Sequence, residues 1–242
     1  MSKRVIAIIP ARIDSSRFPA KMIADATGKP LIQYAWEVAK NAESVTDVYI
    51  ATDSEEIAVR AKEFGGEVIL TGEHPNGTSR IAEAVREIDC DVVVNMQGDE
   101  PELDPSVIDA TVEALGDAPM ATAVCALQDG ELNNENVVKA MIEGNRAVDF
   151  TRQAEKGALR HIGLYVYRPA FLQTYAEMQP TQNEIARRLE QMRAIDNGFS
   201  IAIAQVEPQP SGLILRSSMK NLLIEFFDKF VDISSALADV SV

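Results

Sequence analysis

The stretch VIAIIPARIDSSRFPAK, residues 5–21, decides the fold that we predict for this chain. Five apolar residues open it, most of them β-branched, and Pro10 ends the run. Such a run is typical of a strand buried on both faces, as in a parallel sheet, rather than of one face of a helix. The polar segment that follows contains three cations and several hydroxyls, from Arg12, Ser15, Ser16, Arg17 and Lys21. Because open α/β sheets bind ligands at the carboxyl ends of their strands, we predict that this loop holds an anion.

The overall charge makes this basic loop unusual for its chain. The formal net charge is −14, so the three cations are a local reversal, and a solvated basic loop is the alternative interpretation. The same charge argues against a nucleic-acid backbone or an anionic membrane as the main partner.

The apolar run before Pro10 is shorter than the core of a signal peptide, and no run approaches the roughly 20 residues of a spanning helix. Cys90 and Cys125 form no CxxC motif, so we expect two buried thiols in a cytoplasmic protein.

Alternating patterns along the first half predict repeated βαβ units. Strands are expected at 47–51, 67–70 and 91–96, and helices at 30–39, 55–64 and 79–87. Thr52, Asp53 and Ser54 provide a natural N-cap for the helix 55–64. This order predicts the α/β class, with a Rossmann-like, mostly parallel sheet flanked by helices.

The second half has a different pattern. A helix is expected at 107–114 and a strand at 119–126, followed by strands at 137–141 and 161–167 with a connection at 149–157. A helix at 187–197 and a strand at 199–206 complete the series. We predict one domain over residues 1–212, with a β-rich excursion at about 130–170, and an atypical C-terminal tail over 213–242.

A carboxylate follows the strand predicted at 91–96, in the sequence Gln97-Gly98-Asp99-Glu100-Pro101. Mg²⁺ takes one or two protein carboxylates and completes its octahedron with phosphate oxygens and water, so Asp99 beside an anion-binding loop suits this ion. Ordinary turn residues are the alternative interpretation. The basic loop matches neither the P-loop pattern nor the GxGxxG dinucleotide fingerprint, which argues against P-loop hydrolysis and hydride transfer. A nucleotide site of another design remains, built from backbone amides, cations and a metal.

The segment IIPARIDSSRFPAKMIADATGKPLI resembles the start of the cytidylyltransferases that activate acidic sugars. Five further blocks, HPNGTSRIAEAV, NMQGDEP, VVKA, RHIGLYVYR and LEQMR, are similar to the 3-deoxy-manno-octulosonate (Kdo) cytidylyltransferases within that group. The resemblance runs from about residue 5 to residue 212. It implies a fold of the nucleotide-diphospho-sugar transferase type, a homodimer formed through the β-rich excursion, and transfer of CMP from CTP to Kdo for lipopolysaccharide biosynthesis.

The resemblance also implies a role for individual residues. Arg12 and Lys21 would grip the CTP phosphates, and Asp99 would hold Mg²⁺. The other nucleotide-binding residues implied are Ala11, Ser15, Arg17, Gly77, Thr78, Arg80 and Gln97. The sugar-binding residues implied are Arg152, His161, Tyr165, Glu190 and Gln191. Without the resemblance, His161 would be interpreted as a core histidine, and Glu190 and Gln191 equally well as the solvated face of a helix.

Several positions depart from the family pattern. Ser79 stands where the family commonly has an acidic residue, and Arg187 and Arg188 stand where it commonly has Glu and Ser. The connection 153–159 is also shorter than usual. The sugar is therefore less directly implied than the nucleotide, and another acidic sugar, such as an 8-amino Kdo analogue or a nonulosonate, is the alternative substrate.

The largest departure begins after Gly212. The family continues there as G-[IV]-D-T-P-E-D, and its Asp is the second carboxylate ligand of Mg²⁺, whereas this chain reads LILRSSMKNLLIEF and has no Asp before Asp228. Synonymous codons can be chosen for this string so that the same DNA encodes DTPE when the reading frame is shifted by two bases. We hypothesise that one base was lost near the Leu213 codon, which resequencing of the gene tests. A genuine tail would instead indicate a nucleotide-binding protein without turnover.

Overall fold

The computed structural model describes residues 3–13, 21–25, 28–98 and 100–209. Ser15, Arg17, Asp99 and the tail over 213–242 therefore lie outside the described residues, as does the side chain of Lys21. The predictions made for these positions stay predictions.

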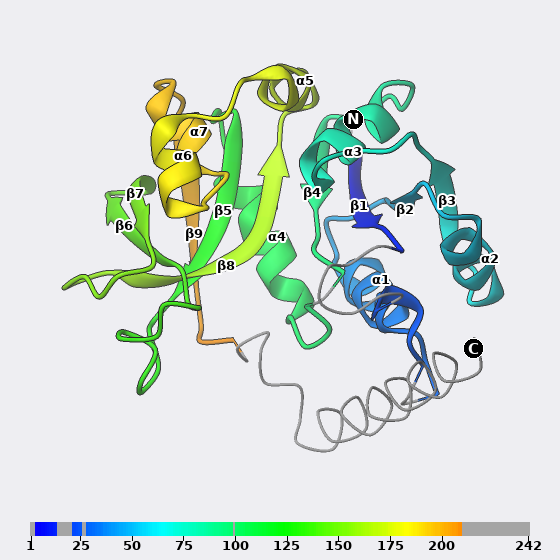
Figure 1. The fold of residues 1–242 in the computed structure, drawn as a ribbon, viewed down its shortest axis with the longest axis horizontal. Helices are drawn as coiled ribbons and strands as arrows, with labels where there is room; N and C mark the ends of the chain where they lie inside the picture. The colour runs from blue at the N-terminus through cyan, green and yellow to red at the C-terminus, as the bar shows by residue number, and fades with distance from the viewer. Residues whose placement is uncertain (1–2, 14–20, 26–27, 99, 210–242) are drawn as a thin grey trace, which may run out of the picture.

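One mixed sheet organises the described chain, with the strand order β3-β2-β1-β4-β8-β5-β9-β7-β6 (Figure 1). The strands are β1 Val5–Ala11, β2 Asp47–Thr52, β3 Glu67–Leu70, β4 Val92–Asn95, β5 Met120–Cys125, β6 Lys139–Glu143, β7 Arg146–Thr151, β8 Leu159–Tyr167 and β9 Ile201–Val206. β3, β2, β1 and β4 are parallel, as the βαβ pattern predicts.

The other half of the sheet corrects the expectation of a mostly parallel sheet. β8 runs antiparallel to both β4 and β5, and β6 and β7 are antiparallel to each other. A parallel return needs a crossover connection, usually a helix, and the described chain forms no helix between β5 and β8. The α/β class is confirmed, whereas the predicted connection at 149–157 is wrong in its first part because β7 extends to Thr151.

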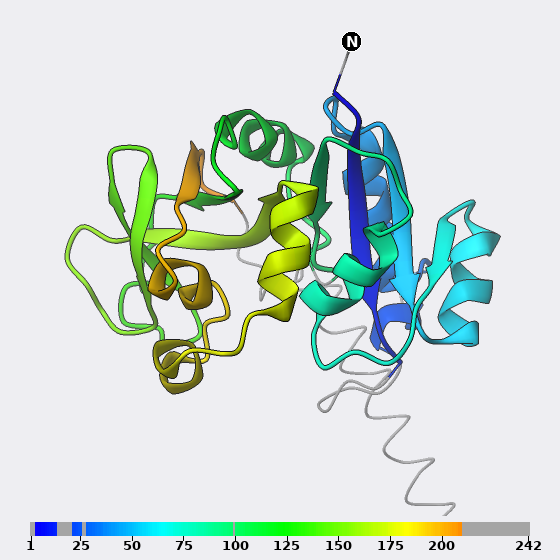
Figure 2. The same ribbon diagram turned by 90° about the horizontal axis from the view of Figure 1, so that it is seen from above.

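Helices cover both faces of this sheet. They are η1 Lys21–Ile23, α1 Leu31–Asn41, α2 Glu55–Glu63, α3 Gly77–Val85, α4 Pro105–Ala114, α5 Pro169–Glu177, α6 Gln182–Arg187 and α7 Met192–Asp196. α1, α2 and α4 contribute to one hydrophobic core, whereas α3, α5 and α7 contribute to the other (Figure 2). β1 serves both cores, because Ala7 and Ile9 face the first and Ile6 and Ile8 face the second. The strand at 5–11 is therefore buried on both faces, as predicted.

Side-chain caps set the start of two helices. The Ser54 side chain accepts a hydrogen bond from the Ile57 amide and caps α2, as predicted. α3 begins at Gly77, two residues before its predicted start at 79, because the Asn76 side chain caps it.

Both thiols are free, but only Cys125 is buried; Cys90 is half-buried. Across the part of the chain that the structure describes, no helix has the length and apolar character needed to cross a membrane.

The predicted helix at 187–197 is wrong in a way that matters for the site. α6 ends at Arg187, and Arg188 adopts the left-handed conformation with φ of 55°. The chain then turns before α7 begins at Met192. Glu190 and Gln191 therefore lie in the connection between two short helices rather than on a continuous helix face.

Candidate active site

The carboxyl ends of β1 and β4 lie next to each other. The two strands are parallel neighbours, with Ile8 opposite Asn95, and Ala11 ends β1 in the core while Arg12 follows it at the surface. The segments that follow β1 and β4 also lie in close contact. A Cβ atom added at Gly98, after β4, would lie only 1.9 Å from the methyl carbon of Met22, after β1. Met22 directly follows Lys21, and Gly98 directly precedes Asp99. Met22, after the basic segment, and Gly98, before Asp99, therefore adjoin at one edge of the sheet.

A cavity of about 170 Å³ opens beside these strand ends. It is lined by Gly77, Thr78, Asn95, Gln97, Tyr165, Tyr167, Tyr175, Glu190 and Gln191. α3 and β4 of the parallel half form one wall, and β8, α5 and the α6–α7 connection form the other. Three residues expected to bind the nucleotide and three expected to bind the sugar thus share one cavity.

Three lining residues were absent from the prediction. Asn95 opens the NMQGDEP block and Tyr167 lies two residues after Tyr165 in RHIGLYVYR, so both were present in the quoted motifs. Side chains at i and i+2 of a strand face the same side, which is a signal that could have found Tyr167. Tyr175 belongs to α5, a helix that we did not predict, and only its packing brings it to the cavity.

Glu190 interacts with residues of α3 and of α5 at the cavity. The Thr78 hydroxyl at the start of α3 lies close enough to the Glu190 carboxylate in the α6–α7 connection to favour its charged form. The Tyr175 hydroxyl donates to the Glu190 carbonyl oxygen at 2.7 Å. Burial raises the pKa of Glu190, and the Thr78 hydroxyl opposes that shift. Glu190 is therefore a partly desolvated carboxyl that contacts both halves of the fold.

The tyrosines present neutral hydroxyl groups to the cavity. Burial raises the pKa of Tyr165, Tyr167 and Tyr175 far above the usual range, so all three stay protonated. Their rings form a row, with centroids 6.2 Å apart between Tyr165 and Tyr167 and 6.0 Å apart between Tyr167 and Tyr175. A phenol both donates and accepts a hydrogen bond, so this wall suits a ligand rich in hydroxyl groups.

His161 lies behind this wall rather than in the cavity lining. Its ring contacts Tyr165 on one side, at a centroid distance of 5.4 Å, and Phe150 on the other, at 5.1 Å. Burial lowers its pKa to about 3, so the imidazole is neutral. Thr122 Oγ1 lies 2.9 Å from His161 Nε2 and 2.7 Å from the Leu164 carbonyl oxygen. Because the hydroxyl has one proton and the carbonyl can only accept, Nε2–H is the donor toward Thr122.

A buried ion pair supports the connection that carries Glu190. The Arg193 guanidinium binds both carboxylate oxygens of Glu184, at 2.8 and 2.5 Å. The same guanidinium lies 5.3 Å from the centre of the Tyr175 ring. α6, α7 and Tyr175 are thus held together beneath the cavity.

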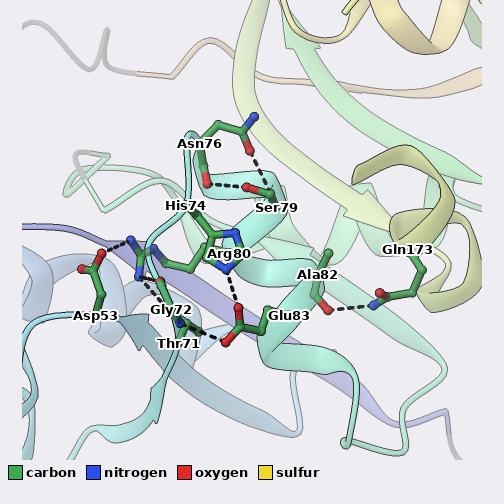
Figure 3. A network of polar contacts seen from close by, with 10 residues as sticks. All are labelled: Asp53, Thr71, Gly72, His74, Asn76, Ser79, Arg80, Ala82, Glu83 and Gln173. Atoms are coloured by element: carbon green, nitrogen blue, oxygen red, sulfur yellow. Dashed lines mark hydrogen bonds and ion pairs between the residues drawn. The ribbon is translucent and has the colours of Figure 1, made fainter. Parts of the chain in front are cut away.

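Two predicted site residues lie elsewhere. The Arg80 guanidinium is 3% exposed and binds Asp53 at 2.7 Å and Thr71 Oγ1 at 2.6 Å, on the side of α3 toward β2 and β3 (Figure 3). Arg152 donates to the backbone carbonyl groups of Glu135 and Asn136, at 3.2 and 3.4 Å. Neither side chain lines the cavity.

The described residues contain no group of three or more His, Cys, Asp or Glu side chains that could hold a metal ion. Magnesium at a phosphate site does not require such a group, because one or two carboxylates suffice when phosphate oxygens and water complete the shell. The donor chemistry at the end of β4, where Asp99 follows Gly98, fits this requirement.

Solved structures of other proteins share the fold of this chain. A solved structure of the inositol-1-phosphate CTP transferase from T. maritima matches 92% of the chain with a TM-score of 0.65 at 12% identity, which shows a shared fold. The structure named CMP:2-keto-3-deoxy-manno-octonic acid synthetase complexed with CTP matches 93% of the chain and 99% of its own, with a TM-score of 0.84 at 29% identity. The fold is therefore that of the nucleotidyltransferases.

The sequence comparisons identify the family. The Cytidylyltransferase family model matches residues 6–203. A 3-deoxy-manno-octulosonate cytidylyltransferase of Syntrophobacter fumaroxidans is 42% identical over 83% of this chain and 88% of its own length. The protein of the same name from Chlorobium limicola is 43% identical over 81% and 86%. The chain belongs to the cytidylyltransferase family and, within it, is similar to the 3-deoxy-manno-octulosonate cytidylyltransferases.

Proposed function

We propose that this protein transfers CMP from CTP to Kdo, giving CMP-Kdo and diphosphate. The observation that carries the proposal is one cavity lined by residues from both the nucleotide blocks and the sugar blocks of the family. The anomeric hydroxyl oxygen of the sugar forms a bond to the α-phosphorus of CTP. The bond from that phosphorus to the bridging oxygen of the diphosphate breaks, and the hydroxyl proton passes to solvent.

The protein contributes mainly by holding two substrates in line. Arg12 and Lys21 neutralise the phosphates at the end of β1, and Gln97 at the end of β4 reaches the ribose. Tyr165, Glu190 and Gln191 bind the sugar hydroxyl groups from the opposite wall. Fixing both reactants in a near-attack geometry accounts for a large part of the rate enhancement of such transfers.

Asp99 is the residue that would hold magnesium. When bound, a divalent metal neutralises charge on the phosphates and so stabilises the transition state. Asp99→Asn is expected to lower diphosphate release at least about a hundredfold, because it removes the carboxylate while keeping its size.

We further propose a homodimer formed through the hairpin of β6 and β7. This hairpin belongs to the β-rich excursion, and Val148 in β7 presents an apolar side chain there that is 41% exposed. Val148→Lys should then shift the protein from dimer to monomer in analytical ultracentrifugation. A wild-type monomer at all concentrations would contradict this interface.

The test of the function is diphosphate release from CTP with each acidic sugar. Kdo is expected to be the best substrate, with an 8-amino Kdo analogue and a nonulosonate as competitors. The assay should use the given chain and a second chain that carries the family ending G-[IV]-D-T-P-E-D after residue 212. Activity only in the second chain would show that the tail over 213–242 removes turnover. No release from either chain with any of these sugars would overturn the proposal.

A further inference from the structure

We infer that Arg80 is a positioning residue of the nucleotide site, acting through α3 on Gly77 and Thr78 rather than by contact with the base. This inference rests on the proposed nucleotide site but not on the identity of the sugar. The family resemblance instead implies that Arg80 contacts the nucleotide directly. Positioning of α3 and direct contact make different predictions for nucleotide binding.

The guanidinium of Arg80 is already engaged on one side of α3. Nη2 binds the Asp53 carboxylate at 2.7 Å, and Nη1 binds Thr71 Oγ1 at 2.6 Å and the Gly72 carbonyl oxygen at 3.3 Å (Figure 3). With 3% of its surface exposed, Arg80 has a desolvated charge whose partner is the Asp53 carboxylate. Leaving these partners to reach a base would cost more than it gains, because a buried charge requires its partner.

Arg80 thereby links α3 to the carboxyl ends of two strands. Asp53 follows β2, and Thr71 follows β3, where its amide donates to the Thr52 carbonyl oxygen at 2.9 Å. Glu83, one turn further along α3, binds the same loop by accepting from the Gly72 amide at 3.0 Å and contacting His74 Nε2 at 2.5 Å. The loop before α3 is thus fastened to the helix itself at two successive turns.

The opposite side of α3 is held as well. Gln173 of α5 donates to the Ala82 carbonyl oxygen at 2.8 Å, and Asn76 Oδ1 accepts from the Ser79 amide at 2.8 Å at the helix start (Figure 3). The Gln173 bond restricts the tilt of α3 against α5, and the Asn76 bond caps the start of the helix.

The start of α3 contacts both parts of the site. A Cβ atom added at Gly77 would lie 3.0 Å from the Pro10 ring, so the helix start packs closely against β1 just before Ala11 and Arg12. Thr78 lines the same cavity as Glu190. A shift of α3 would therefore move the cavity wall relative to the end of β1, and Arg80 prevents that shift.

The experiment measures equilibrium binding of CTP and of UTP, each with magnesium and without sugar, by calorimetry. We expect Arg80→Met to weaken CTP binding about tenfold, the size expected for losing a buried charged hydrogen bond, while the CTP-to-UTP affinity ratio stays within about twofold of wild type. Asp53→Asn should weaken CTP binding similarly, and the double variant no more than the larger single effect, because both act through one interaction. Arg86→Met, at the exposed end of the same helix, is the matched control and should bind CTP as wild type does.

Two results would overturn the inference. A fall in the CTP-to-UTP ratio for Arg80→Met but not for Asp53→Asn would show that the guanidinium reads the base. A lower melting temperature with unchanged CTP affinity in both variants would show that the network only stabilises the fold. If Arg80→Met does not fold, the CTP affinity and the CTP-to-UTP ratio are measured for Asp53→Asn and Thr71→Val instead, and both are compared with wild type. CTP binding by wild type, with no diphosphate release from either the given chain or the chain that carries the family ending, would reject the proposed function and leave this inference intact. Wild type that binds no CTP would reject both.

Discussion

Burial acts on two titratable side chains beside the tyrosine row, and in both cases it favours the uncharged form. It lowers the pKa of His161 to about 3 and raises the pKa of Glu190. The two consequences differ because His161 lies behind the cavity wall, whereas Glu190 faces the cavity. His161 should therefore affect the stability of the fold, and Glu190 should affect substrate binding.

The first prediction concerns acid stability. His161 has a pKa of about 3 when folded and 6.5 when unfolded, so the unfolded state binds the proton first as the pH falls. The stability associated with neutral His161 is present above pH 6.5 and is lost toward pH 3, at up to about 1.4 kcal/mol per pH unit. Urea denaturation between about pH 6 and pH 5 should show this slope in wild type and not in His161→Gln. Equal slopes for the two proteins would contradict the burial of a neutral imidazole.

The second prediction concerns the pH dependence of sugar binding. Glu190 titrates above the ordinary glutamate value of 4.5 because of its burial, and protonation removes a charged acceptor from the cavity. The KM for the sugar in diphosphate release should therefore rise as the pH falls through a pKa above 4.5. Glu190→Gln should have a higher KM, by about tenfold, that no longer changes over this range. A wild-type KM that is constant down to the ordinary glutamate range would contradict this role.

At the scale of elements, the break between α6 and α7 makes the sugar side of the cavity. Thr181 and Glu184 form a capping box at the start of α6, and Arg188 in the left-handed conformation ends it. The turn that follows directs Glu190 and Gln191 to the cavity. The buried pair of Glu184 and Arg193 then fixes the two short helices against each other.

The third prediction tests that pair. Arg193→Met should lower the free energy of unfolding by about 3–5 kcal/mol, because it leaves the buried Glu184 carboxylate without its partner. The double variant Arg193→Met/Glu184→Leu should recover most of the loss, since both charges are then absent. Urea denaturation of the full chain measures both values.

Arg187 provides the matched control for this prediction. It pairs with Asp149 at the surface, where its side chain is 37% exposed. Arg187→Met should cost less than about 1 kcal/mol, because exposed pairs are screened by water. Equal losses for Arg187→Met and Arg193→Met would show that burial of the inner pair does not matter.

At the scale of the whole molecule, β8 joins the two halves of the sheet. It pairs with β4 of the parallel half and with β5 and β6 of the other half. Both hydrophobic cores also extend across this boundary, since each combines residues of β1 and β4 with residues of β5 and β9. The described residues up to 209 should therefore unfold as one cooperative unit.

The fourth prediction follows from that continuity. Trp36 is the only tryptophan of the chain and packs against Phe64 in the parallel half, at a ring distance of 5.4 Å. Tyr165, Tyr167 and Tyr175 report on the boundary and the other half. Urea titrations followed by tryptophan fluorescence and by near-ultraviolet circular dichroism of the tyrosines should have the same midpoint. Two separate midpoints would show that the halves are independent domains.

Short-range patterns determined a large part of this molecule. The apolar run before Pro10 predicts a strand buried on both faces, and Ser54 predicts the start of α2, because each signal involves neighbours along the chain. The βαβ spacing predicts the parallel half for the same reason. The motif blocks identified the family and named six of the nine residues that line the cavity.

Tertiary structure decided the rest, because it depends on partners far apart in the sequence. The antiparallel course of β8 results from pairing with both β4 and β5, and Tyr175 reaches the cavity only through the packing of α5. Arg80 matches a nucleotide motif, yet Asp53 and Thr71, brought to it by β2 and β3, engage its guanidinium. A sequence specifies which groups can form such bonds, but only the packed fold determines which partner lies within reach.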